Sequence, residues 1–285
     1  APWELPAAFQ RSAAARFGQR LRRALIRDAA AVLVATPAVA TLARRLLRVP
    51  ASRLHVVPLA PRPAFRAAEP ASEDAARLGL SGPYLAVFGR FDVRQDARTL
   101  FEALGRLAAE RRPRGLARDA AWPPRVLLLE ATPEDRAALA RAADRAGVGE
   151  SLTYAGPLPA GPVAGLVRGA RAVVLPAISD AAGLTALDAI AAGTPVVATA
   201  IGALPETIGP AGILVEPGDA GRLAAAIRAA WADERIHAGL LEAVRDRQAT
   251  GLRTWADVAL DTRRAYAEAG IRPRPASGSG DRPSG

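Results

Sequence analysis

The stretch Asp180-Ala-Ala-Gly-Leu-Thr-Ala-Leu-Asp-Ala-Ile-Ala-Ala-Gly-Thr-Pro-Val-Val-Ala-Thr199 decides the fold. It predicts a loop, a helix, a turn and a short buried strand in succession. Gly193 ends the expected helix, Thr194-Pro195 makes the turn, and residues 196–198 form the strand. A helix that leads directly into a buried strand is typical of an α/β sheet.

The start of this helix has the character of an anion site. Gly183 and Leu184 lie there, where free backbone N–H groups and the positive end of the helix dipole favour negative charge. Two carboxylates lie eight positions apart, Asp180 in the loop and Asp188 inside the helix. Ionised carboxylates only accept hydrogen bonds, which suits sugar hydroxyls. The stretch therefore predicts a place for a phosphate and a polyhydroxyl ligand.

A structural role explains Asp180 more readily than Asp188. Asp180 could serve only as a cap for the helix. Asp188 lies among apolar residues such as Leu187 and Ile190, where a carboxylate needs a reason. We therefore interpret Asp188 as facing a ligand.

Outward from this stretch, short apolar runs alternate with helical patterns along most of the chain. This alternation predicts a doubly wound parallel α/β sheet, in which ligands bind beyond the carboxyl ends of the strands. Strands are expected at residues 84–88, 125–130, 152–155, 172–176, 196–198 and 212–215, with two earlier ones at 30–35 and 53–58.

The loop that follows the strand at 84–88 supplies a second set of candidate residues. Gly89 and Arg90 come directly after the strand, so the Arg90 guanidinium could meet phosphate oxygens with a fork of donors. Arg94 and Gln95 lie further along the same loop. The alternative for Arg90 is an ion pair with a nearby acid.

Three further polar residues are assigned structural roles. Glu206 is expected to serve the N-terminus of a short helix, and His55 and His237 are expected to be structural.

The composition excludes several classes of protein. The 285 residues include no cysteine, so disulfides and cysteine-based metal sites are excluded. The net charge of +10 comes entirely from arginine, which is scattered along the chain, so we interpret it as a compositional bias and expect no nucleic-acid partner. No dinucleotide-binding glycine motif, Walker loop, serine nucleophile elbow or metal-ligand cluster occurs, and no metal or other cofactor is predicted.

The first helix, expected from Pro6 to Asp28, is amphipathic and basic. Phe9, Phe17, Leu21 and Leu25 share one side of it. The favoured interpretation is a surface helix packed on a domain, and the alternative is contact with an anionic membrane surface. No apolar run reaches the roughly 18 residues of a membrane span, and no signal peptide is visible. We expect a cytoplasmic chain, and on the alternative interpretation this helix would make a peripheral membrane contact.

Taken together, these segments resemble the retaining glycosyltransferases of family 4, which have the GT-B architecture of two Rossmann-like domains facing a cleft. The resemblance runs from about residue 30 to 269. Its most specific part extends from Gly183-Leu184 through Gly218-Asp219, and it includes Ala191 to Thr199, Ile201 to Glu206 and Gly212 to Asp219.

The resemblance implies transfer of a hexose from a nucleoside diphosphate sugar, with retention, to an acceptor such as a glycan, a lipid or a small molecule. It implies that Asp180 contacts the donor sugar and Asp188 the ribose. Arg90, helped by Arg94, would hold the diphosphate together with the backbone N–H groups near Gly183 and Leu184. Catalysis would consist of positioning the donor and neutralising the departing phosphate.

This sequence departs from the family pattern at three of these positions. The family has glutamates where Asp180 and Asp188 stand here, and losing one methylene shortens the reach by about 1.5 Å. The family's lysine position holds Gln95, which carries no charge. These departures keep open a second interpretation, a non-catalytic glycosyltransferase-like subunit that binds a nucleotide or a partner.

The resemblance also divides the chain. Residues 1–50 would be the remnant of an N-terminal acceptor domain, 51–250 the Rossmann-like donor-binding domain, 251–270 a C-terminal helix and 271–285 a disordered tail. Because the sequence starts at Ala1 and contains no methionine, we expect an N-terminally truncated fragment or a processed chain.

The Gln95→Lys variant tests whether position 95 faces the diphosphate. A lysine there restores the family's cation, so we expect nucleotide affinity or turnover to rise, measured by titration and by a steady-state assay. Unchanged turnover and affinity would show that this position has no phosphate role.

Overall fold

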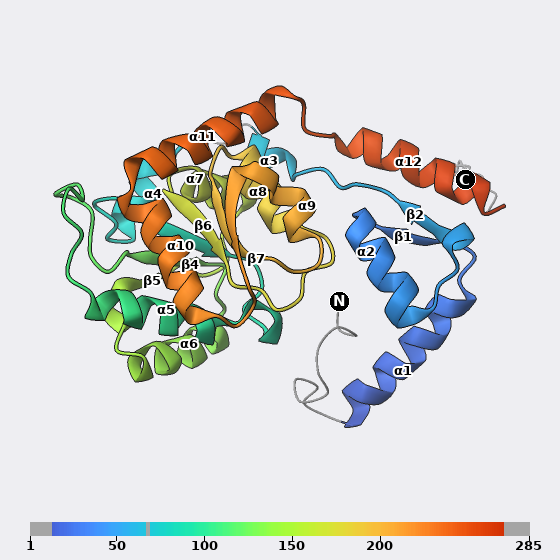
Figure 1. Ribbon diagram of the computed structural model, residues 1–285, viewed down its shortest axis with the longest axis horizontal. Helices are drawn as coiled ribbons and strands as arrows, with labels where there is room; N and C mark the ends of the chain where they lie inside the picture. Colours follow the sequence, from blue (N-terminus) through green and yellow to red (C-terminus); the bar gives the residue numbers. More distant parts are fainter. Residues whose placement is uncertain (1–12, 67–68, 271–285) are drawn as a thin grey trace, which may run out of the picture.

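The computed structural model describes residues 13–66 and 69–270 (Figure 1). Phe9 of the predicted apolar stripe and the predicted tail at 271–285 lie outside the described residues.

A six-stranded, fully parallel sheet forms the centre of the larger part of the chain (Figure 1). The strand order is β5-β4-β3-β6-β7-β8, with each neighbouring pair parallel. This confirms the predicted doubly wound α/β fold. The strands are β3 (Leu85–Phe88), β4 (Val126–Leu129), β5 (Leu152–Tyr154), β6 (Ala172–Leu175), β7 (Val196–Thr199) and β8 (Gly212–Val215).

Helices cover both faces of this sheet, as buried parallel strands require. One face is covered by α5 (Ala97–Ala109), α6 (Pro133–Arg145) and α10 (Ala220–Ala232). The other face is covered by α3 (Pro63–Arg66), α4 (Ser72–Arg77), α7 (Ala160–Arg168), α8 (Leu184–Ala191) and α9 (Leu204–Ile208). The helix α11 (Glu234–Ala249) contributes Leu240 to one core and Val244 to the other.

Alternate residues of each strand enter the two cores. In β7, Val196 and Ala198 pack with α7 and α8, whereas Val197 packs with α5 and α10. Successive side chains of a strand point to opposite faces, so an apolar run without alternation fills both cores. The continuous apolar runs in the sequence follow from this arrangement.

A smaller N-terminal unit (residues 13–56) lies beside this domain (Figure 1). Its strand β1 pairs in parallel with β2 in a separate two-stranded sheet. The predicted division at residue 51 does not follow this pairing, because β2 joins the earlier strand rather than the six-stranded sheet. The elements are α1 (Ala13–Asp28), β1 (Val32–Val34), α2 (Pro37–Leu42), a π-helical turn (Ala43–Leu47), a 3₁₀ turn (Ala51–Arg53) and β2 (Leu54–Val56).

The apolar stripe of α1 faces away from the other described residues. Phe17, Leu21 and Leu25 are 69%, 52% and 62% exposed, while Ile26 on the opposite side packs toward the core around Leu47. Packing of this stripe on a domain, the favoured expectation, is therefore not what the structure shows. Among the described residues, no helix is long and apolar enough to span a bilayer.

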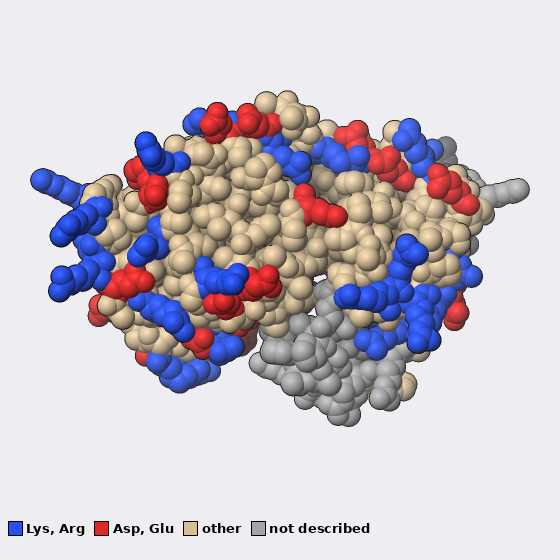
Figure 2. All heavy atoms as spheres, viewed as in Figure 1, with Lys and Arg blue, Asp and Glu red and all other residues tan. Residues whose placement is uncertain are grey.

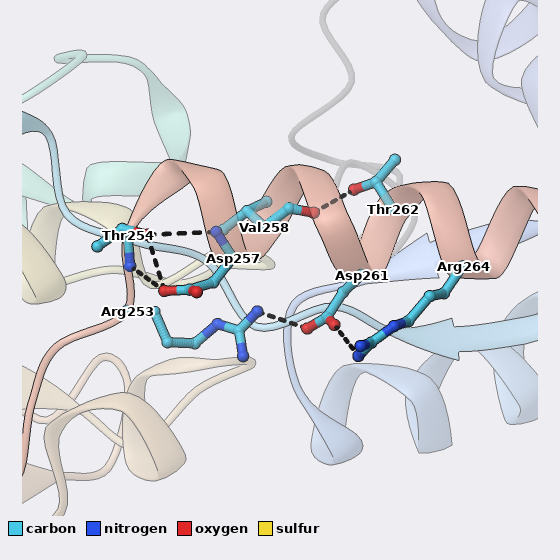
Figure 3. Close-up of polar contacts among 7 residues, drawn as sticks. All are labelled: Arg253, Thr254, Asp257, Val258, Asp261, Thr262 and Arg264. Atoms are coloured by element: carbon cyan, nitrogen blue, oxygen red, sulfur yellow. Dashed lines mark hydrogen bonds and ion pairs between the residues drawn. The ribbon is translucent and has the colours of Figure 1, made fainter.

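The last described helix, α12 (Trp255–Glu268), returns from the domain to the N-terminal unit. Thr254 and Asp257 cap its first turn reciprocally, and Asp261 bridges Arg253 and Arg264 (Figure 3). The indole of Trp255 donates to the carbonyl of Pro61 at 3.1 Å.

Two tryptophans offer a matched test of the core. Trp231 is fully buried and donates to Ala121 O at 3.1 Å, whereas Trp255 is 42% exposed and makes an equivalent bond. We expect Trp231→Ala to lower the unfolding free energy by about 3–5 kcal/mol, because it also leaves a cavity. Trp255→Ala should cost about 1 kcal/mol. Urea unfolding followed by circular dichroism measures both, and equal losses would contradict this description of the core.

Candidate functional site

The strand order reverses between β3 and β6, which places a crevice beyond their carboxyl ends. The loops that follow these two strands both end at this crevice. They are joined to each other, because Ile178 N donates to Arg94 O at 2.8 Å. The two candidate regions chosen from the sequence are therefore neighbours in space.

Two pockets open at this crevice, with volumes of about 400 Å³ and 750 Å³. The residues that line both are Arg90, Asp92, Leu184 and Thr185. The smaller pocket also receives Arg94, Gln95 and Asp180, and the larger one Gly89 and Asp188. All the predicted site residues except Gly183 thus line one of the two pockets, and Gly183 lies directly before the shared Leu184.

Asp180 closes its own loop. Its Oδ1 accepts the backbone N–H groups of Ala182 at 2.9 Å and Gly183 at 2.6 Å. The structural alternative for Asp180, a cap before the helix, is therefore present. The carboxylate still lines the smaller pocket, so this capping leaves its contact with a ligand sugar as a prediction.

The loop requires glycine at two positions. Gly183 has φ +65°, and an added Cβ would lie 2.4 Å from Thr207 Oγ1. Gly202 has φ +57°, and an added Cβ would lie 1.7 Å from the carbonyl oxygen of Asp180. These approaches, with the bond from Ala203 N to Asp180 O at 2.9 Å, hold the loop against α9.

The two arginines of the other loop differ in their partners. Arg94 forms an ion pair with Asp92, with Nε donating to Oδ1 at 2.9 Å. Burial acts to raise the pKa of Asp92, but the Arg94 hydrogen bonds and charge outweigh it and hold that pKa below its ordinary value. Arg90 is exposed and makes no direct ion pair with any described residue, although its charge also helps to lower the pKa of Asp92. The ion pair suggested by the sequence for Arg90 is made by Arg94 instead.

Gln95 supports the backbone of its own loop. Its Nε2 donates to the carbonyl of Phe88 at 3.1 Å, at the end of β3. A Cβ at Gly89, which has φ +111°, would lie 3.3 Å from this nitrogen. Gln95 therefore shapes the turn that presents Arg90, in addition to lining the smaller pocket.

Asp188 is fully buried and bonded to Arg62 through both oxygens. Oδ1 accepts the backbone N–H and Oδ2 accepts Nε of Arg62, each at 2.7 Å. The Arg62 side chain is 37% exposed and lines the larger pocket. The carboxylate of Asp188 in this apolar helix is explained by its ion pair with Arg62. It does not face the pocket as a free acceptor.

Burial raises the pKa of Asp188, and the hydrogen bonds and charge of Arg62 offset only part of this effect. The charge of Glu130 raises it further. A folded pKa above the ordinary 3.8 means that the folded state binds this proton more tightly than the unfolded chain. The unfolding free energy therefore falls as pH rises from 3.8 through the folded pKa, and is constant above it.

Sequence reasoning missed Arg62 and Glu130. Arg62 lies 126 positions before its partner, and no local pattern signals that contact. Glu130 follows β4 with φ +65°, which is uncommon for a residue with a side chain, and lines the larger pocket. Its position at the carboxyl end of the strand predicted at 125–130 was the available signal.

The two histidines lie outside both pockets, in line with their structural interpretation. His237 Nε2 lies 3.0 Å from Arg171 O, and burial lowers the pKa of His237. His55 pairs with Glu268 at 3.3 Å. Within the described ranges, no group of three acidic or histidine side chains is arranged to hold a metal ion.

Residues 82–233, a little over half of the sequence, match the profile of the family described as glycosyl transferases group 1. The chain belongs to this family. The match confirms the resemblance to family 4 glycosyltransferases, and it spans all six strands of the large sheet together with both loops of the crevice.

Relatives and solved structures agree with this assignment. The chain is 34% identical to D-inositol 3-phosphate glycosyltransferase of Mycolicibacterium smegmatis over 160 residues, which are 53% of this chain and 34% of the relative. It is 40% identical to the enzyme of that name, numbered 1, from Catenulispora acidiphila over 103 residues, 35% of this chain and 24% of the relative. The matches therefore span a quarter to a third of these curated relatives.

Among solved structures, sucrose-phosphate synthase from Thermosynechococcus elongatus is 26% identical, with a TM-score of 0.71 over 87% of this chain and 60% of its own. HepE of Anabaena, solved in complex with UDP and glucose, is 17% identical, with a TM-score of 0.70 over 88% of this chain and 66% of its own. The latter likeness shows the fold alone. The six-stranded part of this chain is the Rossmann-like α/β domain of a group 1 glycosyltransferase.

Removing Arg62 tests the buried ion pair. Arg62→Ala removes the guanidinium from Asp188 Oδ2 and keeps only the backbone N–H bond to Oδ1, so we expect a loss of about 1–3 kcal/mol at neutral pH. The loss should shrink in acid, because protonation of Asp188 removes the charge that Arg62 neutralises. Urea unfolding at several pH values measures this, with the exposed Arg77→Ala as control at less than about 0.5 kcal/mol. A loss that does not depend on pH would contradict the pairing.

Proposed function

We propose that this domain binds a nucleoside diphosphate sugar and takes part in transferring its hexose, with retention, to an acceptor. Membership of the glycosyltransferase family supports the reaction class. The crevice supports the location of the binding site, because Arg90 and the N-terminus of α8 line both of its pockets. The acceptor is not assigned.

Arg90 carries this proposal. It is an exposed guanidinium without an ion pair among the described residues, and it lines both pockets. Leu184 and Thr185, the first residues of α8, line the same two pockets. Their backbone N–H groups lack acceptors within the helix. A diphosphate between Arg90 and this helix start would be held by charge and by backbone donors.

The rest of the donor is assigned to the two pockets on either side. The smaller pocket, with Asp180, takes the sugar, and the larger pocket takes the nucleoside. The solved HepE complex contains UDP and glucose, and we adopt a UDP-sugar as the first donor to test. No covalent nucleophile is needed, since catalysis rests on positioning and on neutralising the leaving diphosphate.

Asp188 requires a modified role in this proposal. Its oxygens are occupied by Arg62 and its side chain is fully buried. We propose that Asp188 acts on the nucleoside through Arg62, whose partly exposed guanidinium lines the larger pocket. Contact of Asp188 with a ribose hydroxyl would require the Arg62 side chain to move.

The ion pairs also give specific support to the second candidate, a nucleotide-binding subunit without turnover. Arg94 is neutralised by Asp92, and Gln95 is uncharged and bonded to Phe88 O. The crevice therefore presents fewer available cations than the family pattern implies. On this alternative the domain binds a nucleotide and does not cleave the donor.

Membrane contact of α1 stays a prediction. The apolar stripe of the helix is exposed, as such contact would require. Arginines on the face shown in Figure 2 gather toward the two ends of the molecule and leave its middle largely uncharged.

Arg90→Ala tests the proposal through nucleotide affinity. Hydrogen bonds to charged groups are worth about 1.5–3 kcal/mol, so we expect the Kd for UDP to rise about ten- to a hundredfold. Arg94→Ala should have a smaller effect, because that side chain is already paired with Asp92. Isothermal titration calorimetry with UDP, GDP and ADP measures these affinities.

Arg98→Ala is the matched control, since Arg98 is an exposed arginine of α5 paired with Glu102. An Arg90 variant with the affinity of this control would refute the diphosphate assignment. Binding of UDP-glucose without release of UDP would favour the non-catalytic candidate.

A further inference from the structure

The helix α9 is held tightly against the wall of the smaller pocket. Ala203 N, just before α9, donates to Asp180 O, and Gly202 and Gly183 have no room for a Cβ against Asp180 and Thr207. Thr207, inside α9, is buried. A close-packed interface of this kind transmits displacement rather than absorbing it. The helix α9 and the loop from Asp180 to Gly183 therefore form one mechanical unit.

The exposed side of α9 reaches the N-terminal unit. Both carboxylate oxygens of Glu206 lie 3.2 Å from the backbone nitrogen of Ala38, in the first turn of α2. The sequence predicts that Glu206 serves a helix N-terminus, and the helix it serves belongs to another part of the chain, 168 positions away.

This contact completes the first turn of α2. Pro37 has no N–H, and the N–H of Val39 is accepted by Thr36 Oγ1 at 3.3 Å. Glu206 accepts the N–H of Ala38, the intervening residue. A negative charge is stabilising at this end of a helix. The bond therefore satisfies a specific donor rather than forming an incidental surface contact.

The loop from Asp180 to Gly183 lies between the two parts that Glu206 connects. Ala181 and Ala182 line the smaller pocket and also an apolar pocket of about 480 Å³ on their other side. The walls of that apolar pocket include Val34 of β1, Val39 of α2 and Val258 of α12. A shift of the N-terminal unit would therefore change the support behind this loop.

We propose that Glu206 is a positioning residue that couples the N-terminal unit to the loop from Asp180 to Gly183 through α9. The effect on a bound sugar rests on the proposed function, because it requires this loop to carry the donor sugar. The coupling itself is a property of the fold and is measurable without a ligand.

Amide hydrogen exchange, followed by NMR on the whole chain, tests the coupling. In Glu206→Ala we expect exchange to accelerate about fivefold, the usual effect of losing a helix cap, at Ala38 and also at Ala182 and Gly183. Glu206→Gln keeps an acceptor without the charge and should give a smaller acceleration at the same amides. Glu216→Ala, which removes an exposed glutamate of the loop after β8, should accelerate none of them.

Two outcomes would overturn the proposal. Acceleration at Ala38 alone would show a local cap without coupling to the loop. Wild-type exchange at Ala38, Ala182 and Gly183 in both Glu206 variants would show that the contact supports neither part.

Donor binding separates this inference from the proposed function. We expect Glu206→Ala to weaken UDP-glucose binding about fivefold and UDP binding by less, since UDP lacks the sugar that this loop would carry. If the wild-type chain binds neither ligand, the proposed function fails, while the exchange result still decides the coupling. If it binds both and Glu206→Ala changes neither affinity, the coupling does not extend to the donor sugar.

Discussion

The carboxylate of Asp180 holds together the part of the structure on which the site depends. Its Oδ1 accepts hydrogen bonds from the N–H groups of Ala182 and Gly183. The backbone carbonyl of Asp180 accepts the N–H of Ala203. These bonds fold the loop after β6 so that α8 begins at the crevice with its next N–H groups free. Without this closure the helix start, and therefore the proposed anion site, would not face Arg90.

The site is also defined by which charges are already neutralised. Arg94 is paired with Asp92, and Asp188 with Arg62, so two charges that sequence comparison would give to a ligand are used internally. Arg90 remains the exposed cation shared by both pockets. In the proposed function, this distribution leaves one arginine and one helix N-terminus to hold the diphosphate, and it makes Arg62 a candidate contact for the nucleoside.

The sequence predicted the large sheet well because its strands are apolar on both faces. Runs such as Val196 to Ala198 are recognisable without knowledge of their neighbours, and the alternation with helices implies the parallel order. The closeness of the loops after β3 and β6 was predictable, because the carboxyl ends of parallel strands lie at the same edge of a sheet. The pairing of β2 with β1 was not predictable in this way, because a three-residue strand carries no signal of its partner.

The residues that the sequence could not assign are those whose partners are distant. The bond from Arg62 to Asp188 and the contact from Glu206 to Ala38 both join segments more than a hundred positions apart. Within the loop after β3, Arg90 and Arg94 each lie two positions from Asp92 in the sequence. Only the folded conformation of the loop decides that Arg94 forms the ion pair. Charge type is thus readable from sequence, whereas charge availability requires the fold.

In the proposed function, the crevice at the carboxyl ends of β3 and β6 binds a nucleoside diphosphate. Titration of the ¹⁵N-labelled chain with UDP, followed by amide chemical shifts, tests it most directly. We expect the largest shifts at Arg90, Leu184 and Thr185. Shifts confined to the pocket at the opposite ends of these strands, near Tyr84 and His237, would contradict it, as would the absence of any shift at millimolar UDP.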